Sequence, residues 1–177
     1  MRFFGDPDDP LYEEVLTRVG KATSWRTRIK RCMPESNFLP AASDAMLRKV
    51  ERALGHCIPK DLQALLRECN GVDTPYSSLV YSTDRLIEVN LTMRSADYLA
   101  DRMPLDHLLF FGGVGDGDEF GFPRNRDGSF GTTVFIWSHE TDAREEYAMG
   151  LFDYIVKYTV EIYTPYMKNR NVPIDER

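Results

Sequence analysis

One stretch of the chain, residues 103–140, alternates three segments of strand-forming residues with two segments of turn-forming residues. It reads MPLDHLLFFGGVGDGDEFGFPRNRDGSFGTTVFIWSHE. Residues 107–111, 119–122 and 132–138 are rich in apolar, aromatic and β-branched side chains, which are typical of strands. The glycine-rich loop after the first segment and the turn at residues 125–131 are short enough to join neighbouring strands. The sequence therefore predicts three adjacent antiparallel strands in this part of the chain.

Two consecutive helices are predicted before these strands. Ser43 is suited to the N-cap of a helix through residue 53, which Gly55 can end. Pro59 is suited to the first position of a second helix, whose apolar residues at 62, 65, 66 and 69 form its buried face. The pair Asn70-Gly71 is expected to supply a left-handed cap at the end of this helix. Two helices with so short a connection are expected to pack as a pair.

The N-terminal forty residues carry a helix signal and then a basic segment. Residues 10–19 have apolar side chains at helical spacing, with acidic residues just before them, where negative charge favours a helix N-terminus. Residues 21–40 are interpreted as a connector, because the two prolines at its end argue against a continuous helix. The connector contains Trp25 and a basic cluster: Arg26, Arg28, Lys30 and Arg31.

The remaining segments complete the expected fold. Short strands are predicted at residues 79–82 and 86–89, a helical passage around Asp97, and a helix at residues 149–163 with an apolar face, followed by a polar tail that frays after Pro165. This order predicts a single α+β domain, an antiparallel twisted sheet of about four to six strands flanked by helices. The expected divisions are residues 1–40 for the N-terminal helix and basic connector, 41–166 for the α+β domain and 167–177 for the polar tail.

Composition limits the classes of function. The formal net charge of −6 argues against nucleic-acid binding, because that binding depends on many Lys and Arg contacts to phosphates. A basic partner is better suited to this chain. No window approaches the ~20 apolar residues that span a bilayer, and the first residues lack the features of a secretion signal, so we expect a cytoplasmic protein without a membrane partner. The 3 cysteines have no paired spacing and are expected to be reduced.

Three motifs of known binding chemistry are incomplete here. The loop glycines are spaced G-x-G-x-G rather than G-x-G-x-x-G, and the aspartates between them would repel a phosphate. The same loop lacks the third ligand of a calcium-binding EF-hand. His139-Glu140 begins like a zinc-protease signature, but Ala143 stands where the second histidine is needed. We therefore expect no metal and no cofactor.

Neither a nucleophile elbow nor a phosphate-binding lysine motif is present, so enzymatic activity is not expected. One enzymatic alternative stays open, because Asp116 and Glu140 have the chemistry of a general acid and base, although the sequence does not fix their separation. The basic cluster also leaves two interpretations open. It is either a nucleic-acid contact with Trp25 as a stacking surface, which is disfavoured by the net charge, or a solvated face that pairs with acidic N-terminal residues.

Two blocks of the sequence together resemble one known family. The first is LRKVERALGHCIPKDLQALLRECNGV, in which a helix ending in Leu-Gly leads to Ile-Pro, a second helix and then Asn-Gly. The second consists of GDGDEFGF and VFIWSHE. In this order they are similar to the SUKH superfamily, the Smi/Knr-like fold of fungal killer-toxin-resistance and glucan-synthesis regulators, which also occurs in bacterial toxin immunity proteins. The resemblance covers roughly residues 41–163.

This resemblance implies a non-enzymatic, protein-binding module. The leading hypothesis is a cytoplasmic immunity protein that neutralises a nuclease-type toxin by masking its active surface. The alternative is an intracellular regulator or scaffold of the glucan-synthesis type. Because an acidic loop complements a basic substrate groove, we expect the partner to be a basic toxin domain. The expected contact residues are Asp116, Asp118, Glu119, Trp137, Glu140 and Asp142.

Aromatic residues alternate along the predicted strands, so one subset must face the core while the other can face solvent. An outward subset beside the acidic loop would form the apolar centre of a binding face with a charged rim. The residues concerned are Phe110, Phe111, Phe120, Phe122 and Trp137.

Overall fold

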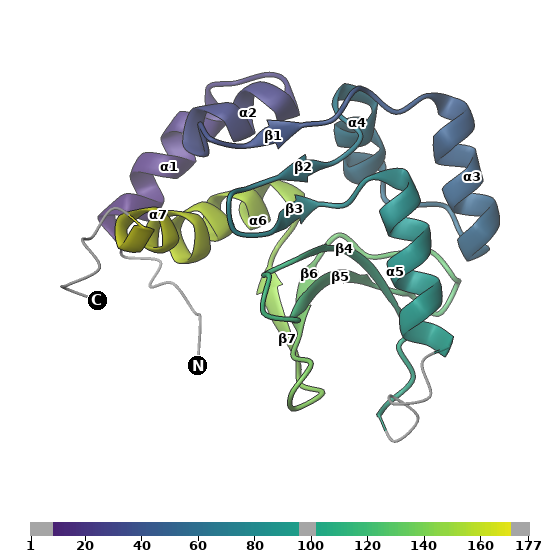
Figure 1. The fold of residues 1–177 in the computed structure, drawn as a ribbon. Helices are drawn as coiled ribbons and strands as arrows, with labels where there is room; N and C mark the ends of the chain where they lie inside the picture. Colours follow the sequence, from purple (N-terminus) through teal and green to yellow (C-terminus); the bar gives the residue numbers. More distant parts are fainter. Residues whose placement is uncertain (1–8, 96–101, 171–177) are drawn as a thin grey trace.

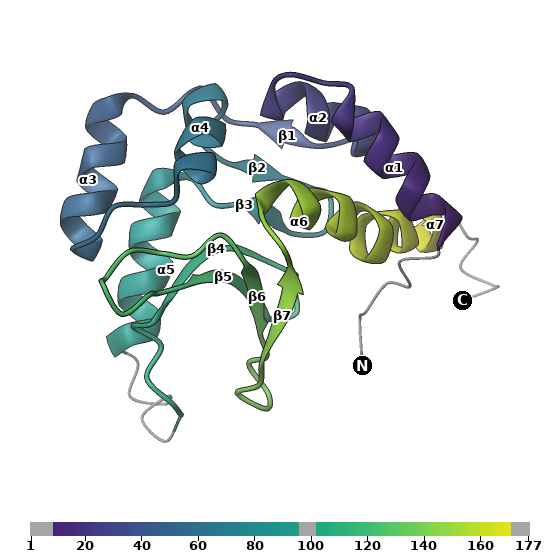
Figure 2. The same ribbon diagram turned by 180° about the vertical axis from the view of Figure 1, so that it is seen from behind.

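The computed structural model describes residues 9–95 and 102–170 and has the predicted α+β class, which is confirmed. Its strands are divided between two antiparallel sheets, one of three strands in the order β1-β2-β3 and one of four in the order β4-β5-β6-β7. Figures 1 and 2 show the sheets one above the other, with α3 and α5 at one side and the C-terminal helices at the other. The passage around Asp97 lies outside the described residues.

The N-terminal segment contains two helices rather than one helix and a connector. Helix α1 spans Pro10–Gly20, and its N-cap Asp9 accepts a hydrogen bond from the amide of Leu11. Helix α2 spans Trp25–Cys32, so the interpretation of the basic segment as a connector was wrong. The Ser24 side chain caps α2, and a buried stripe that includes Trp25 and Ile29 packs it onto the core, so the helix forms despite the prolines that follow.

The two helices predicted next are confirmed. Helix α3 spans Asp44–Leu54 with Ser43 as its N-cap and Gly55 in the left-handed conformation at its end. Helix α4 spans Lys60–Glu68, with Pro59 one position earlier than predicted. The expected left-handed cap at Asn70-Gly71 was wrong, because the helix ends at Cys69, whose backbone is extended. Arg67 of α4 pairs with Asp44 of α3 at 3.1 Å, and Gln63 of α4 donates to Glu51 of α3 at 3.2 Å, so the two helices lie side by side. Helix α3 also packs against α5, and α4 against α2.

The smaller sheet consists of very short strands: β1 at Asn37–Phe38, β2 at Val72–Asp73 and β3 at Ser78–Val80. The strand predicted at residues 86–89 was wrong, because this segment lies within α5, which spans Thr83–Ser95. Leu86 and Val89 are one helical turn apart and are both buried on one face of α5. A short apolar run fits a helix or a strand equally well until its packing partner is known.

The larger sheet contains the three predicted strands and one more. They are β4 at Leu108–Gly113, β5 at Glu119–Pro123 and β6 at Val134–Trp137, paired antiparallel in the predicted order. Strand β7, at Arg144–Ala148, pairs with β6. It was not predicted, because the first three residues of the strand are charged.

The C-terminal helix is longer than predicted. It comprises α6 at Leu151–Tyr158, the π-helical segment η2 at Thr159–Tyr163 and α7 at Thr164–Arg170. The expected fraying after Pro165 was therefore wrong for the described residues up to Arg170. Pro165 directly follows the π-helical segment η2, where the hydrogen-bond ladder is already shifted from the α-helical pattern, so the missing amide of a proline is tolerated there.

The core between the larger sheet and α6 is aromatic. Phe111 stacks on Phe122 with ring centroids 4.5 Å apart, and Tyr154 of α6 packs edge-on against Phe111 at 5.1 Å and against Phe120 at 4.8 Å. The Tyr154 hydroxyl donates to the carbonyl of Leu79 in β3 at 2.9 Å. Helix α6 therefore binds both sheets. No helix within residues 9–95 and 102–170 has the length and apolar character needed to cross a membrane.

The two sheets and α5 meet along β4. The amide of Tyr81 donates to the carbonyl of Phe111 at 2.7 Å, and an added Cβ at Gly112 would lie 2.3 Å from the carbonyl oxygen of Leu79. On the side of α5, the Asn90 side chain accepts from the amide of Phe110 at 3.0 Å and donates to its carbonyl at 2.8 Å. Asn90 thus replaces a neighbouring strand at this position.

We predict that Asn90→Ala destabilises the fold strongly. The substitution leaves the buried amide and carbonyl of Phe110 without partners, and each such group costs about 1–3 kcal/mol. The free energy of unfolding, measured by urea denaturation, should fall by about 2–5 kcal/mol. The control Asn169→Ala, at an exposed position of α7, should change it by less than about 0.5 kcal/mol. Equal losses in both variants would contradict the role assigned to Asn90.

Candidate functional site

Two hairpin turns lie side by side at one end of the larger sheet. They are the β4–β5 turn at residues 114–118 and the β6–β7 turn at residues 138–143, which share an end because alternate turns of an antiparallel sheet do so. Asp118 joins them, since its Oδ1 accepts from the backbone amide of His139 at 2.9 Å and lies 2.8 Å from the ring Nδ1. The hydrogen bond to Asp118 raises the pKa of His139.

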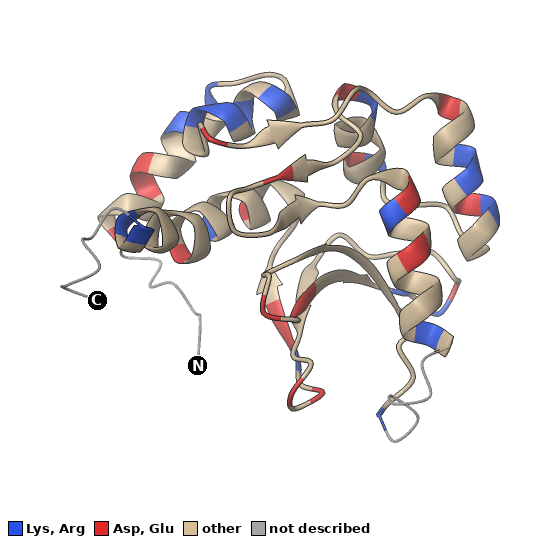
Figure 3. Cartoon of the chain, in the orientation of Figure 1, with Lys and Arg blue, Asp and Glu red and all other residues tan. Residues whose placement is uncertain are grey.

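Acidic side chains gather on these turns and on the edge strand β7. Figure 3 shows them on the β6–β7 hairpin and on the neighbouring β4–β5 turn. We call this set the acidic hairpin surface, and it comprises Asp116, Asp118, Glu140, Glu145 and Glu146. Four of these side chains are exposed, and Asp118 is half-buried. Arg102 is a nearby cation, but its guanidinium donates to the backbone carbonyls of His139 and Glu140 rather than to a carboxylate.

Trp137 and Asp142, both predicted as contact residues, have internal partners. Trp137 is 2% exposed, and its Nε1 donates to Oδ1 of Asp142 at 2.7 Å. Asp142 also accepts from Arg144 at 3.0 Å and from the amide of Met103 at 2.9 Å. Burial opposes ionisation of Asp142, but these hydrogen bonds and the positive charge of Arg144 outweigh it and lower the pKa. The pair therefore holds the β6–β7 turn against residues 102–107, beneath the exposed surface.

Glu119, another predicted contact residue, points toward the smaller sheet. Its Oε2 accepts from the hydroxyl of Tyr81 at 2.7 Å, and the side chain is largely buried between β5 and the residues that follow β3. Burial raises the pKa of Glu119 from 4.5 to about 7, although the hydrogen bond from Tyr81 and the charge of Arg85 favour the ionised form. Three of the six predicted contact residues therefore belong to the acidic hairpin surface, and three have internal partners. The first group is Asp116, Asp118 and Glu140, and the second is Glu119, Trp137 and Asp142.

None of the five aromatic residues predicted to alternate along these strands faces outward. Phe110, Phe111, Phe120, Phe122 and Trp137 are all at most 2% exposed, because both faces of the central strands are covered. The aromatic residues beside the acidic loop are instead Tyr76, in the β2–β3 turn, and Tyr166 of α7, whose ring centroids lie 4.9 Å apart. Tyr76 is 38% exposed. A Cβ atom added at Gly115 would lie 2.9 Å from the carbonyl oxygen of Tyr76, so the two turns pack closely.

Sequence analysis missed this tyrosine pair. The available signal was an aromatic residue inside a turn, Pro75-Tyr76-Ser77, where a buried role is uncommon. Tyr166 carried no such signal, because its place beside Tyr76 depends on the continuation of the C-terminal helix.

The basic cluster of α2 has aromatic partners. Arg26 and Lys30 lie over the ring of Phe38 at 5.0 and 6.0 Å, and Arg28 lies over Trp25 at 4.9 Å. Trp25 is 8% exposed and covered, so it offers no free ring for stacking on a base. Within the described chain, none of the four cationic side chains forms an ion pair. Of the aspartates that precede α1, only Asp9 lies among the described residues, and it caps α1 instead.

The two carboxylates considered as a general acid and base lie on open turns. Asp116 and Glu140 are both exposed to solvent. Among residues 9–95 and 102–170, no group of three or more His, Cys, Asp or Glu side chains is arranged to hold a metal ion. The loop glycines Gly115 and Gly117 have positive φ angles and serve the turn.

We predict that Glu119 makes stability depend on pH. Its pKa is higher in the folded protein than the ordinary value of 4.5, so its stabilising contribution is complete below about pH 4.5 and is lost as pH rises through about 7, because the unfolded chain releases the proton first. Relative to Glu119→Gln, the wild type should lose up to ~3 kcal/mol of unfolding free energy over this range. Urea denaturation at a series of pH values measures the difference.

Tyr81→Phe is the matched variant, which should increase the pH dependence that Glu119→Gln removes. It removes the hydrogen bond that favours the ionised carboxylate, so the pKa of Glu119 should rise further and the loss with pH should become larger. A wild-type pH profile in both variants would refute the assignment.

Comparison with known proteins agrees with this architecture. A family model described as SUKH_6, SMI1-KNR4 cell-wall, matches residues 44–155, from the start of α3 into α6. No curated protein matches the chain significantly. The matched segment covers most of the chain, including both hairpin turns, and the chain therefore belongs to the SUKH superfamily, in its SMI1-KNR4 branch.

Proposed function

Starting from this family membership, we propose that the chain is a non-enzymatic immunity protein, which neutralises a nuclease-type toxin by covering the toxin's active surface. The observation that carries the proposal is the acidic hairpin surface, where two turns place exposed carboxylates at one end of a rigid sheet. A nuclease must bind phosphates and so presents a basic groove. A surface of opposite charge can occupy that groove and exclude the substrate.

Electrostatics supports fast recognition of such a partner. Complementary charges steer encounter and raise association rates, and the chain's formal net charge of −6 has the appropriate sign. The exposed acids Asp116, Glu140, Glu145 and Glu146 have no cationic side chain bound to them within the described residues. Their charge is therefore available to a partner.

Rigidity supports tight binding as well. The bridge from Asp118 to His139 joins the two turns, and the bonds of Asp142 to Trp137 and Arg144 fix the second turn from below. A surface that is ordered before binding loses less conformational entropy in the complex. In this proposal Trp137, Glu119 and Asp142 support the contact surface, and Asp116, Asp118 and Glu140 contact the toxin.

Tyr76 and Tyr166 supply an aromatic centre beside these charges. Tyrosines are enriched among the residues that dominate binding energy at interfaces, and they are effective where polar neighbours surround them. The pair adjoins the β4–β5 turn, so the proposed interface extends from the β6–β7 turn across Asp116 to α7.

A second candidate function is an intracellular regulator or scaffold that binds an endogenous protein. The cell-wall description of the matching family favours it. Co-expression with a toxin-like gene beside this one separates the two functions: rescue of growth with a stable complex supports immunity, whereas no rescue together with capture of a housekeeping protein supports regulation.

We predict that the double variant Asp116→Asn/Glu140→Gln binds the toxin domain more slowly. Removing two rim charges should reduce the association rate by about tenfold at low salt and flatten its salt dependence, because steering is weakened. The control Glu13→Gln/Asp61→Asn removes the same charge from exposed positions on α1 and α4. Stopped-flow measurements on both variants test the surface, and equal effects would show that only net charge matters.

We predict that Tyr76→Ala acts on dissociation instead. Truncation of an interface aromatic costs about 2 kcal/mol or more, so affinity should fall at least about thirtyfold through a faster dissociation rate. Leu91→Ala is the control, since Leu91 is 44% exposed on α5. Surface plasmon resonance measures both rates, and an unchanged dissociation rate would exclude the tyrosine pair from the interface.

A further inference from the structure

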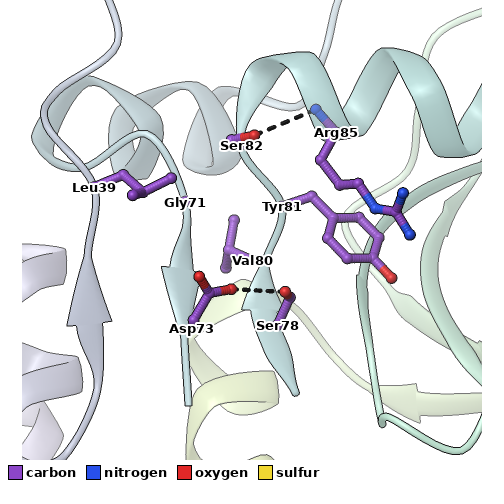
Figure 4. Close-up of a pocket in the computed structure, with 8 residues that line it drawn as sticks. All are labelled: Leu39, Gly71, Asp73, Ser78, Val80, Tyr81, Ser82 and Arg85. Carbon is purple, nitrogen blue, oxygen red and sulfur yellow. Dashed lines mark hydrogen bonds between the residues drawn. The ribbon is translucent and has the colours of Figure 1, made fainter. Parts of the chain in front are cut away.

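A hollow opens on the face of the smaller sheet, at the point where β3 leads into α5. Figure 4 shows it bounded by Leu39 after β1, by Asp73 of β2 and by Arg85 of α5. Val80 forms part of its lining and is otherwise buried. Its volume is about 190 Å³. Small-molecule sites are usually ~300–1,000 Å³, so the hollow has the size for a single side chain rather than for a cofactor.

Gly71 is needed to form this hollow. Its φ is +106°, in the region that favours glycine, and an added Cβ would lie 2.9 Å from the backbone nitrogen of Ser82. The amide of Thr83 donates to the side chain of the adjacent Asn70 at 2.8 Å, which fixes the start of α5 against this segment. The wall formed by Gly71 and Ser82 is therefore set by backbone, whereas Leu39, Asp73 and Arg85 line the hollow with their side chains.

The uncompensated charge of the hollow is negative. Arg85 lies over the ring of Tyr81 at 5.7 Å and pairs with Glu88 at 3.0 Å, so its charge is balanced within α5. Asp73 accepts a hydrogen bond from the hydroxyl of Ser78 at 2.7 Å and forms no ion pair within the described residues. Its carboxylate can accept further hydrogen bonds from a cation.

We propose that this hollow receives an arginine or lysine side chain that projects from a basic protein partner. Leu39, which is 36% exposed, and Val80 would contact the aliphatic part of that side chain, and Asp73 would bind its charged end. Long basic side chains bury their stems on apolar surface while the head group meets a carboxylate. The inference rests on the proposed function for the identity of the partner.

The position of the hollow fits one continuous interface. Asp73 is followed by the β2–β3 turn, which carries Tyr76, and Gly115 of the acidic turn packs against that turn. The turn is itself held by hydrogen bonds between Thr74 and Ser77. A partner on the acidic hairpin surface and Tyr76 can therefore reach the hollow over the same turn.

The test uses a blocked peptide, Gly-Gly-Arg-Gly-Gly, titrated into the isotope-labelled protein and followed by amide NMR shifts. We expect saturable shifts at Leu39, Gly71 and Val80, and no comparable shifts with Gly-Gly-Glu-Gly-Gly. Asp73→Asn should weaken the arginine peptide at least about tenfold, since a charge-assisted hydrogen bond is lost. Asp61→Asn, an exposed acid on α4, should leave the affinity unchanged.

Arg85→Gln provides a second variant that keeps Asp73. It should bind the arginine peptide as tightly as the wild type or more tightly, because a competing cation is removed. Three outcomes would refute binding of a basic side chain in the hollow: equal binding of the two peptides, unchanged affinity in Asp73→Asn, or shifts confined to the acidic turns. None of these outcomes would contradict the proposed function. A different pair of results would contradict the proposed function. If the arginine peptide fills the hollow but the Asp116→Asn/Glu140→Gln variant binds the toxin as the wild type does, the acidic hairpin surface is excluded from toxin binding.

Discussion

Strand β4 is the element on which the structure depends, because both sheets and α5 meet along its backbone. All of its residues are buried, and a buried amide or carbonyl without a partner is costly. The hydrogen-bond partners of the β4 backbone are β5 on one side, and the Asn90 side chain and the amide of Tyr81 on the other. The strands of the smaller sheet are too short to be stable alone, so this junction makes them part of one framework.

The same framework fixes what the surface can do. Because the aromatic side chains of β4 and β5 pack inward against the tyrosines of α6, the exposed parts of the larger sheet are its turns and its edge strand. These carry the carboxylates, and the internal bonds of Asp118 and Asp142 keep them in place. Fixed charges at the tips of a rigid sheet are suited to recognising another macromolecule.

The basic cluster of α2 and the acidic hairpin surface lie far apart in the molecule (Figure 3). Helix α2 and the β6–β7 hairpin lie at opposite ends in both views of the fold, so the basic cluster cannot neutralise the acidic hairpin surface within one chain. Three of the four cations of the cluster, Arg26, Arg28 and Lys30, lie over the rings of Phe38 and Trp25 instead. This arrangement stabilises them without a carboxylate and leaves the negative charge of the hairpins unopposed.

The sequence by itself determined the α+β class, helices α3 and α4 with the Ser43 cap, and the order of β4, β5 and β6, because these depend on local periodicity and on turn residues. It also identified the acidic loop. Only the tertiary structure decided that residues 86–89 are helical, that α2 forms, and that β7 completes the sheet, since short or charged segments take their conformation from what they pack against. The same holds for the site: Trp137 and Asp142 became internal partners. The pairing of Tyr76 with Tyr166 and the hollow at Asp73 arose where segments far apart in sequence meet, which no local pattern records.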